Sequence, residues 1–359
     1  MNDQMHLALI INNGVSPHSI GAWRLPHSYQ GFDFARPQYW QHIARTLERG
    51  RFDLLFFSDS NNLHDNYKNS PDGAIRYAAQ FPRHDPMPLV PICSGVTEHL
   101  GIGVTVSTAY SHPFSLARQF ATLDHLTEGR IGWNIVASGG RAEAENFGRE
   151  TVMGHDERYE YADEFVELCG KLWNSWEPDA VLMNRESGEY ADPAKVHRVE
   201  HVGKYFSCRG PLNVIPSPQV SPLLIQAGSS PRGLAFSVKH AEVQFAVRGS
   251  AEGMKQHRQA LNKALAQQGR APTDLKVLWG VNVIVDETAA GAEAKKEALL
   301  SVATDEAALA LMSGHFNFDL SKLPANEPIG ALETDGIQGM IDMVINDFGD
   351  NVTLLEAAR

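Results

Sequence analysis

Short apolar runs alternate with amphipathic segments along most of the chain. The runs are rich in β-branched and aromatic residues and are bounded by Gly, Pro, Asn or charged residues, as is typical of buried parallel strands. Seven runs are predicted to be strands: 7–12, 54–58, 101–107, 131–136, 223–227, 243–247 and 277–285. Segments between them carry apolar residues at helical spacing. The alternation predicts a parallel α/β fold.

The stretch 111–148 is the most informative part of this pattern. It begins with a helix whose buried face is formed by Leu116, Phe120, Leu123 and Leu126. The strand 131–136 follows, with Asn134 inside it and Ser138 at its exit. Polar groups at the carboxyl ends of parallel barrel strands line active sites, so both residues are site candidates. The alternative is that Asn134 only satisfies buried backbone.

The chain shows no repeat and no clear linker, so residues 1–359 are expected to form one (β/α) domain. A barrel of this kind uses about 250 residues, which leaves room for insertions. The segment 179–219 is rich in Pro, Gly and charge, and is predicted to be an insertion with one or two hairpins. An eighth strand is not visible. The tail 336–359 is predicted to be helical.

Composition narrows the classes of partner. The formal net charge of −12 argues against binding to nucleic acid or to an anionic membrane surface. The three cysteines are far apart and form no Cys-x-x-Cys motif, which indicates a reducing cytoplasm. No apolar segment reaches the roughly 18 residues of a membrane span, and the apolar run at 7–11 is too short for a signal peptide.

Two pairs of residues could form an anion site. Ser229 and Ser230 lie between the fifth strand and a helix, where backbone N–H groups and hydroxyls can hold a phosphate. The alternative is a plain helix cap by Ser230. His155 and Tyr159 are four residues apart at the start of the helix predicted at 157–176, with Asp156 as its expected cap. Without a phosphate, an exposed His and a packed Tyr would explain them.

Further polar residues follow other strands. Asp59 and Thr105 lie at or near the exits of the second and third strands. Together with Asn134, Ser138 and the serines after the fifth strand, they are expected to surround one mouth of a barrel.

A zinc-peptidase pattern, His-x-x-Glu-His, occurs at 197–201. Pro193 and Gly203 flank the run, no third ligand is evident, and a long helical stripe is missing, so no metal site is predicted. No glycine-rich dinucleotide loop follows a strand either.

Several motifs occur in order along nearly the whole chain. They include Gly-Ala-Trp-Arg, Phe-Phe-Ser-Asp, Gly-Trp-Asn, Asn-Phe-Gly, His-Asp-Glu-Arg-Tyr, Gly-Lys-Tyr-Phe and Gln-Ala-Gly-Ser-Ser, at 21–24, 56–59, 132–134, 146–148, 155–159, 203–206 and 226–230. With these motifs the chain resembles the nitrilotriacetate monooxygenase, pristinamycin synthase and dibenzothiophene-sulfone monooxygenase group of the bacterial luciferase-like flavin monooxygenases.

The resemblance implies a TIM-type (β/α)8 barrel with insertions. It implies an enzyme that uses FMN, as FMNH2 supplied by a separate NAD(P)H-dependent flavin reductase, and O2 to oxygenate a small organic substrate through a C4a-hydroperoxyflavin. Members of the group usually continue beyond this chain's end, so the last βα unit is expected to be missing. A homodimer is also implied. The alternatives are a deazaflavin-dependent oxidoreductase with the same barrel and a non-catalytic flavin-binding protein.

The resemblance also implies residue roles. Asp59 and Thr105 would contact the flavin or its ribityl chain, and Asn134 would lie near the ring. The phosphate would be held by four residues, His155, Tyr159, Ser229 and Ser230.

His18 and His315 are candidate catalytic residues near the substrate, because a neutral imidazole can donate a hydrogen bond or act as a base. The alternative is that each is a loop histidine bonded to backbone. The loop 60–86 and the insertion 179–219 are candidate lids.

Overall fold

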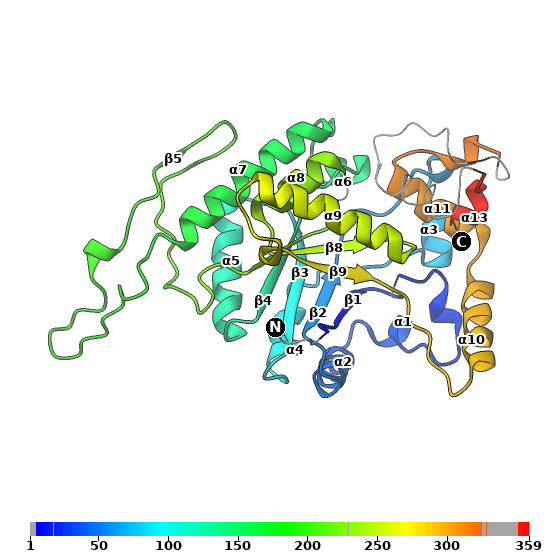
Figure 1. Ribbon diagram of the computed structural model, residues 1–359, viewed down its shortest axis with the longest axis horizontal. Helices are drawn as coiled ribbons and strands as arrows, with labels where there is room; N and C mark the ends of the chain where they lie inside the picture. Colours follow the sequence, from blue (N-terminus) through cyan, green and yellow to red (C-terminus); the bar gives the residue numbers. More distant parts are fainter. Residues whose placement is uncertain (1–4, 17, 229, 325–327, 329–350, 359) are drawn as a thin grey trace.

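Seven parallel strands form the centre of the computed structural model, which describes residues 5–16, 18–228, 230–324, 328 and 351–358 (Figure 1). The strand order is β1-β2-β3-β4-β7-β8-β9. The bounds are β1 (Ala8–Asn12), β2 (Leu54–Ser58), β3 (Gly101–Ser107), β4 (Ile131–Val136), β7 (Leu223–Gln226), β8 (Val243–Val247) and β9 (Lys276–Gly280). The first six predicted strands are confirmed to within one residue at each end.

The seventh strand is shorter than predicted. β9 ends at Gly280, which pairs with Val247 at the end of β8. The alternating Val281, Val283 and Val285 are 65%, 75% and 72% exposed. The β-branched run 281–285, interrupted only by Asn282, resembles a strand, but β8 ends at Val247 and offers no further backbone to pair with it. In the described part of the chain, β1 and β9 are the two ends of the sheet.

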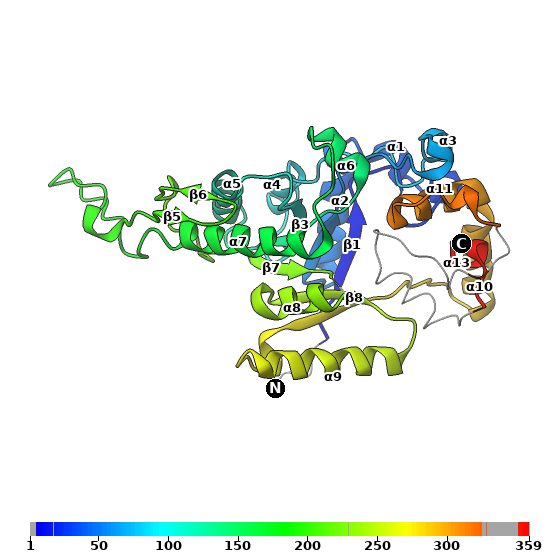
Figure 2. The same ribbon diagram turned by 90° about the horizontal axis from the view of Figure 1, so that it is seen from above.

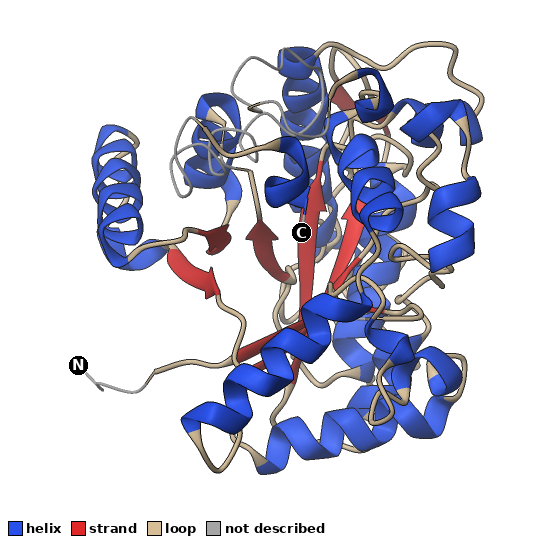
Figure 3. Ribbon diagram, turned by 90° about the vertical axis from the view of Figure 1, so that its right-hand side faces the viewer, coloured by secondary structure: helices blue, strands red, loops and turns tan. Residues whose placement is uncertain are grey.

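Helices surround the strands in all three views (Figures 1, 2 and 3). Their bounds are α1 (Gln30–Asp33), α2 (Pro37–Arg49), α3 (Asp72–Tyr77), α4 (Leu89–Ser94), α5 (Pro113–Leu126), α6 (Arg141–Asn146), α7 (His155–Trp173), α8 (Pro231–His240), α9 (Ala251–Gln267), α10 (Ala289–Val302), α11 (Asp305–Phe316) and α13 (Leu354–Ala358). The main core lies between sheet and helices, where Phe120 of α5 contacts Trp133 of β4 at 5.8 Å between ring centroids. No helix among the described residues is long and apolar enough to cross a bilayer.

Two predicted details are wrong. The helix expected from 157 begins at His155, and its cap is Gly154 rather than Asp156. Gly154 has the non-helical backbone that a cap requires, whereas Asp156 already lies in the first turn, where its charge favours the helix dipole. The loop 60–86 is not structureless, since it contains a 3-10 turn (Tyr67–Asn69) and α3. The predicted tail helix lies mostly outside the described residues.

The segment 179–219, predicted to be an insertion, projects from the barrel at the left of Figure 1. It contains the antiparallel pair β5 (His201–Val202) and β6 (Ser207–Cys208). Glu164 of α7 fixes this hairpin by accepting hydrogen bonds from the backbone N–H groups of Tyr205 (3.0 Å) and Phe206 (2.8 Å).

Strand register brings polar residues of neighbouring strands side by side at the carboxyl end of the sheet. Asn12 lies beside Ser58, and Thr105 lies beside Asn134. Because all seven strands are parallel, their carboxyl ends open on the same mouth.

Candidate active site

Two adjoining cavities of about 930 Å³ and 340 Å³ open at the carboxyl ends of the strands. Asp59 after β2, Val136 at the end of β4 and Glu143 of α6 line both of them. The two cavities therefore form one depression with a larger and a smaller arm.

A chain of hydrogen bonds crosses the strand ends. Asn134 Nδ2 donates to Thr105 Oγ1 at 2.9 Å, and Thr105 Oγ1 donates to the carbonyl of Phe57 at 2.8 Å. The buried Oδ1 of Asn134 has no hydrogen-bond partner in the described part of the chain, and neither amide atom of the fully buried Asn12 has one. A buried acceptor without a donor costs about 1–3 kcal/mol. Thr105 lines the larger arm, whereas neither asparagine is a lining residue of either arm, so the two amides lie just behind the cavity wall.

The smaller arm ends where α7 and α8 begin. Ser230 Oγ accepts from the N–H of Gly233 at 3.1 Å, so the predicted cap is present. The same oxygen lies 3.3 Å from Nε2 of His155, so capping and lining the cavity are not exclusive. The rings of His155 and Tyr159 are 5.3 Å apart. Ser229 lies outside the described residues.

The turn before α8 closely surrounds the Tyr159 hydroxyl. A Cβ added to Gly228 would lie 2.8 Å from this oxygen, and one added to Gly233 would lie 2.7 Å from it. Burial raises the pKa of Tyr159, although hydrogen bonds with Ser230 and Gln226 act to lower it. The phenol therefore stays protonated and can donate a hydrogen bond. The glycines are thus needed for the turn to close on Tyr159.

Arg158 is a lining residue of the smaller arm that was not among the predicted site residues. It donates to the carbonyl of Met153 at 2.8 Å, and a Cβ on Gly139 would lie 2.8 Å from its guanidinium. Arg158 follows His155 by three residues, and that helical spacing could have indicated it. Ser138, a predicted rim residue, lines the same arm.

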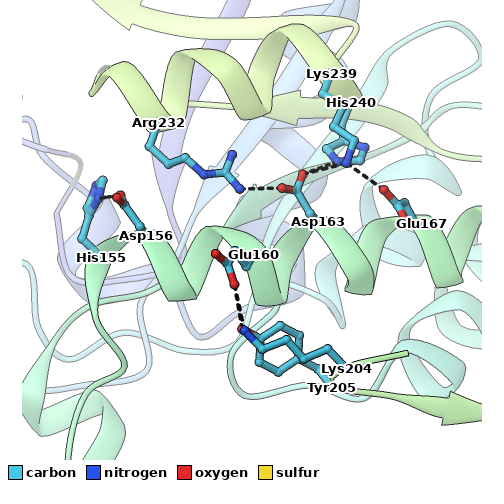
Figure 4. A network of polar contacts seen from close by, with 10 residues as sticks. All are labelled: His155, Asp156, Glu160, Asp163, Glu167, Lys204, Tyr205, Arg232, Lys239 and His240. Atoms are coloured by element: carbon cyan, nitrogen blue, oxygen red, sulfur yellow. Dashed lines mark hydrogen bonds and ion pairs between the residues drawn. The ribbon is translucent and has the colours of Figure 1, made fainter. Parts of the chain in front are cut away.

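An ion-pair network fixes α8 on α7 (Figure 4). Asp163 accepts from Arg232 Nη2 at 2.5 Å and lies 2.6 Å from Nε2 of His240. Although burial opposes it, hydrogen bonds from His240 and Arg232 hold the pKa of Asp163 at about 2. Arg232 also lies over the ring of Tyr159, 5.4 Å from its centroid. The network therefore holds the two helix starts at the cavity in fixed relation.

Acidic groups lie where the two arms meet. Burial raises the pKa of Asp59 to about 7, against the nearby charge of Arg83. Burial also raises the pKa of Glu143, whose Oε1 accepts from the backbone N–H (3.2 Å) and the Nδ2 (3.1 Å) of Asn61. Asp59 can therefore take up or release a proton near neutral pH.

Histidines from three separate segments approach the same mouth. His315 of α11 lines the smaller arm, and its ring lies 5.4 Å from that of His64. His18 Nε2 lies 3.3 Å from Ser58 Oγ. Burial and the positive charge of Arg83 lower the pKa of both His18 and His315 to about 4. The pKa of His64 is lowered to about 3 by burial, with contributions from His315 and Arg83. All three are neutral at pH 7. His64 was not predicted from the sequence.

The two histidines of the zinc-like pattern have other contacts. His197 Nε2 lies 2.7 Å from Glu177 Oε1. His201 lies between Glu164 (3.1 Å) and Lys171 (3.1 Å), where the hairpin contacts α7.

Comparison with known proteins agrees with this geometry. The family model of luciferase-like monooxygenases matches residues 11–334. The dibenzothiophene-sulfone monooxygenase of Rhodococcus erythropolis (strain XP) is 42% identical over 327 residues, which cover 91% of this chain and 72% of that protein. The crystal structure of the long-chain alkane monooxygenase LadA has a TM-score of 0.89 at 39% identity, covering 95% of this chain and 78% of that one. A riboflavin lyase solved with modified FMN and riboflavin has a TM-score of 0.91 at 32% identity, covering 99% and 78%.

The chain belongs to the luciferase-like monooxygenase family, and its seven parallel strands form the nearly closed TIM-type barrel of that family. It is a reduced-flavin-dependent monooxygenase of the two-component kind, as its resemblance predicted.

Proposed function

We propose that this enzyme binds FMN as FMNH2, received from a separate NAD(P)H-dependent flavin reductase, and uses O2 to oxygenate a small organic substrate held in the larger arm. The observation that carries the proposal is the convergence of Ser230, His155 and Arg158 on the smaller arm. Hydroxyl, imidazole and guanidinium groups beside a helix start are suited to a phosphate.

The phosphate end fits the residues present. The ten-residue helix α8 directs its first backbone N–H groups and the positive end of its dipole toward the arm. Tyr159 contributes a protonated phenol, packed against glycines where a side chain would close the space. The modified FMN in the related riboflavin lyase structure supports this choice of flavin.

The opposite end fits a flavin ring and ribityl chain. Asn134 presents an unpaired amide oxygen beside Thr105, and Asp59 lies where the arms meet. When bound, the reduced flavin would supply the chemistry that activates O2. The protein's part is to orient the substrate and exclude water, and Asp59 can hold a proton near pH 7.

His18 and His315 are proposed to act as neutral hydrogen-bond donors where the flavin of the smaller arm meets the substrate, since His315 lines that arm and His18 contacts Ser58 at the end of β2. With pKa values of about 4 they are poor bases at pH 7, which favours a donor role. The segment 60–86 remains a proposed lid, because its residues Ser60 and Asn62 line both arms. The insertion 179–219 contributes no described lining residue to either arm, so nothing in the cavity supports the expected lid role for it.

We also propose that residues 1–359 act as one barrel domain carrying the insertion 179–219, that the enzyme is a cytoplasmic homodimer, and that neither a nucleic acid nor a membrane is its partner. The dispersed cysteines support the cytoplasm, and the net charge of −12 argues against a nucleic acid or an anionic membrane as partner. Sedimentation of the purified enzyme tests the dimer.

The test is a reconstituted assay. The purified chain should bind FMN, more tightly when reduced, and should show substrate-dependent oxygen uptake only with an added flavin reductase and NADH. NADH oxidation by the chain alone would contradict the two-component scheme. Activity with a deazaflavin and no oxygen uptake would show an oxidoreductase instead. FMN binding without any oxygenated product across sulfone, alkane and aminopolycarboxylate substrates would indicate a flavin carrier.

A further inference from the structure

Arg83 presents a guanidinium to the larger arm without an acidic partner. Its Nη1 donates to Ser60 Oγ at 3.1 Å and its Nη2 to Gln80 Oε1 at 2.9 Å, both neutral groups. Its buried Nε has no hydrogen-bond partner among the described residues. Within the same residues, no ion pair closer than 4.0 Å involves Arg83. A partly buried cation in this state is suited to an incoming anion.

The backbone on both sides of Arg83 is fixed. The N–H of His84 donates to the carbonyl of Asn13 at 2.6 Å, and that of Val15 donates to the carbonyl of Pro82 at 3.2 Å. A Cβ on Gly14 would lie 2.9 Å from this Pro82 oxygen, so the two segments are in close contact. Arg83 is thus held beside the end of β1 before any ligand arrives, which reduces the ordering cost of binding.

The groups around Arg83 leave its charge incompletely neutralised. Asp59 is the acidic group that acts on it, and burial brings the pKa of this carboxyl to about 7, so it is partly protonated at neutral pH. His18, His64 and His315 are uncharged there, and the positive charge of Arg83 contributes to lowering the pKa of each. The charge therefore acts across the mouth of the barrel.

We propose that the larger arm takes an organic anion whose carboxylate or sulfonate oxygens bind Arg83, which makes Arg83 a specificity-determining residue. The claim rests on the proposed oxygenase function and adds the substrate class. A guanidinium offers parallel N–H donors to two oxygens of one anionic group. The same arm is lined by Tyr110 stacked on Phe147, with ring centroids 4.5 Å apart, and by Met87, which suit an apolar or aromatic body.

The experiment measures binding by calorimetry to the FMN-loaded enzyme. Benzoate and benzenesulfonate are compared with the neutral benzamide and benzenesulfonamide. Both anions, or one of them, should bind at least about tenfold more tightly than the matching amide. Arg83→Met should remove that preference. Arg45→Met removes an exposed guanidinium of α2 outside both cavities and should leave it unchanged.

Anions that bind no better than amides, or an anion preference that survives in Arg83→Met, would overturn the inference. If Arg83→Met fails to fold, Arg83→Lys keeps the charge but loses the paired donors. It should retain a weakened anion preference, and an undiminished preference in it would equally count against the proposal. FMN titration is scored separately: absence of FMN binding defeats the proposed function, while the anion titration of the flavin-free chain still decides this inference.

Discussion

The Nε2 atom of His155 lies 3.3 Å from the Oγ of Ser230, although the two residues are 75 positions apart in the chain. The contact joins the first residue of α7 to the cap of α8. Two helix starts therefore meet at the smaller arm, where their dipoles add to the side-chain donors. This relationship is the basis for assigning the arm to a phosphate.

Replacing both Ser230 with Ala and Tyr159 with Phe should weaken FMN binding by roughly 1–3 kcal/mol. Two hydroxyl donors beside a charged group are lost, and that is the usual magnitude for such bonds. Quenching of FMN fluorescence on titration measures the change. An unaltered titration curve would remove the phosphate assignment.

Ser250→Ala is the matched control for the cap. Ser250 Oγ accepts from the N–H of Gly253 at 3.1 Å at the start of α9, just as Ser230 accepts from Gly233 at 3.1 Å. Loss of either cap should lower the free energy of unfolding by about 1 kcal/mol. Only the Ser230 change should also weaken FMN binding, because Ser250 lies outside both cavities.

Asp59→Asn should stabilise the fold at pH 8. Burial raises the pKa of this carboxyl from 3.8 to about 7, so the folded state holds its proton more tightly than the unfolded state does. The stability of the wild type therefore falls as pH rises from about 4 to 7, by up to about 4 kcal/mol. Asparagine avoids that loss. Thermal unfolding at several pH values should show the variant more stable at pH 8 and the difference shrinking toward pH 4.

Asp53→Asn should have the opposite sign. Asp53 accepts from the N–H of Leu7 at 2.8 Å and lies 3.0 Å from His6, and although burial opposes them these contacts lower its pKa. Its charge favours folding, so its removal should lower the melting temperature at pH 8. If both Asp variants shift stability the same way, burial is not what sets the pKa of Asp59.

Gly314→Ala should destabilise the fold by about 1–3 kcal/mol through overpacking. A Cβ at this position would lie 2.0 Å from Nδ1 of His64, so the imidazole or α11 must move. Gly170→Ala is the control, because its Cβ would meet nothing within 4 Å near the end of α7. That change should stabilise by about 0.5–1 kcal/mol. Urea unfolding distinguishes the two, and equal effects would mean that His64 is not in contact with Gly314.

Residues on strands, at strand exits and at helix starts were the parts of the site that the sequence pattern could predict. Thr105 and Asn134 occupy matching positions on neighbouring parallel strands, so their hydrogen bond follows from register once the apolar runs are recognised. The same reasoning failed for Val281 and the alternating valines after it, because strand pattern alone does not supply a neighbouring strand.

Arg83 and His64 could not be predicted for a different reason. Both lie in the connection 60–86, whose path depends on contacts with the end of β1 and with α11, distant in sequence. In the sequence, a charged residue of such a segment resembles an ordinary exposed surface residue. An irregular segment has no helical or strand periodicity from which its cavity-facing side could be predicted.

Asp163→Asn should loosen α8 from α7. The pKa of Asp163 is about 2 in the folded state against an ordinary 3.8, so its contribution to stability is complete above pH 4 and is lost as pH falls toward 2. At pH 7 the variant should lose about 1–2 kcal/mol of unfolding free energy, allowing for partial exposure of the network. Asp163 also pairs with Lys239 of α8 at 3.4 Å. Glu167→Gln is the control, since Glu167 pairs with that lysine at 2.7 Å but its side chain is 46% exposed. Unfolding curves at pH 7 and pH 3 should show a gap for Asp163→Asn that narrows at the lower pH, and little change for Glu167→Gln. A gap that stays constant between these pH values would show that the carboxylate charge is not what holds the two helices together.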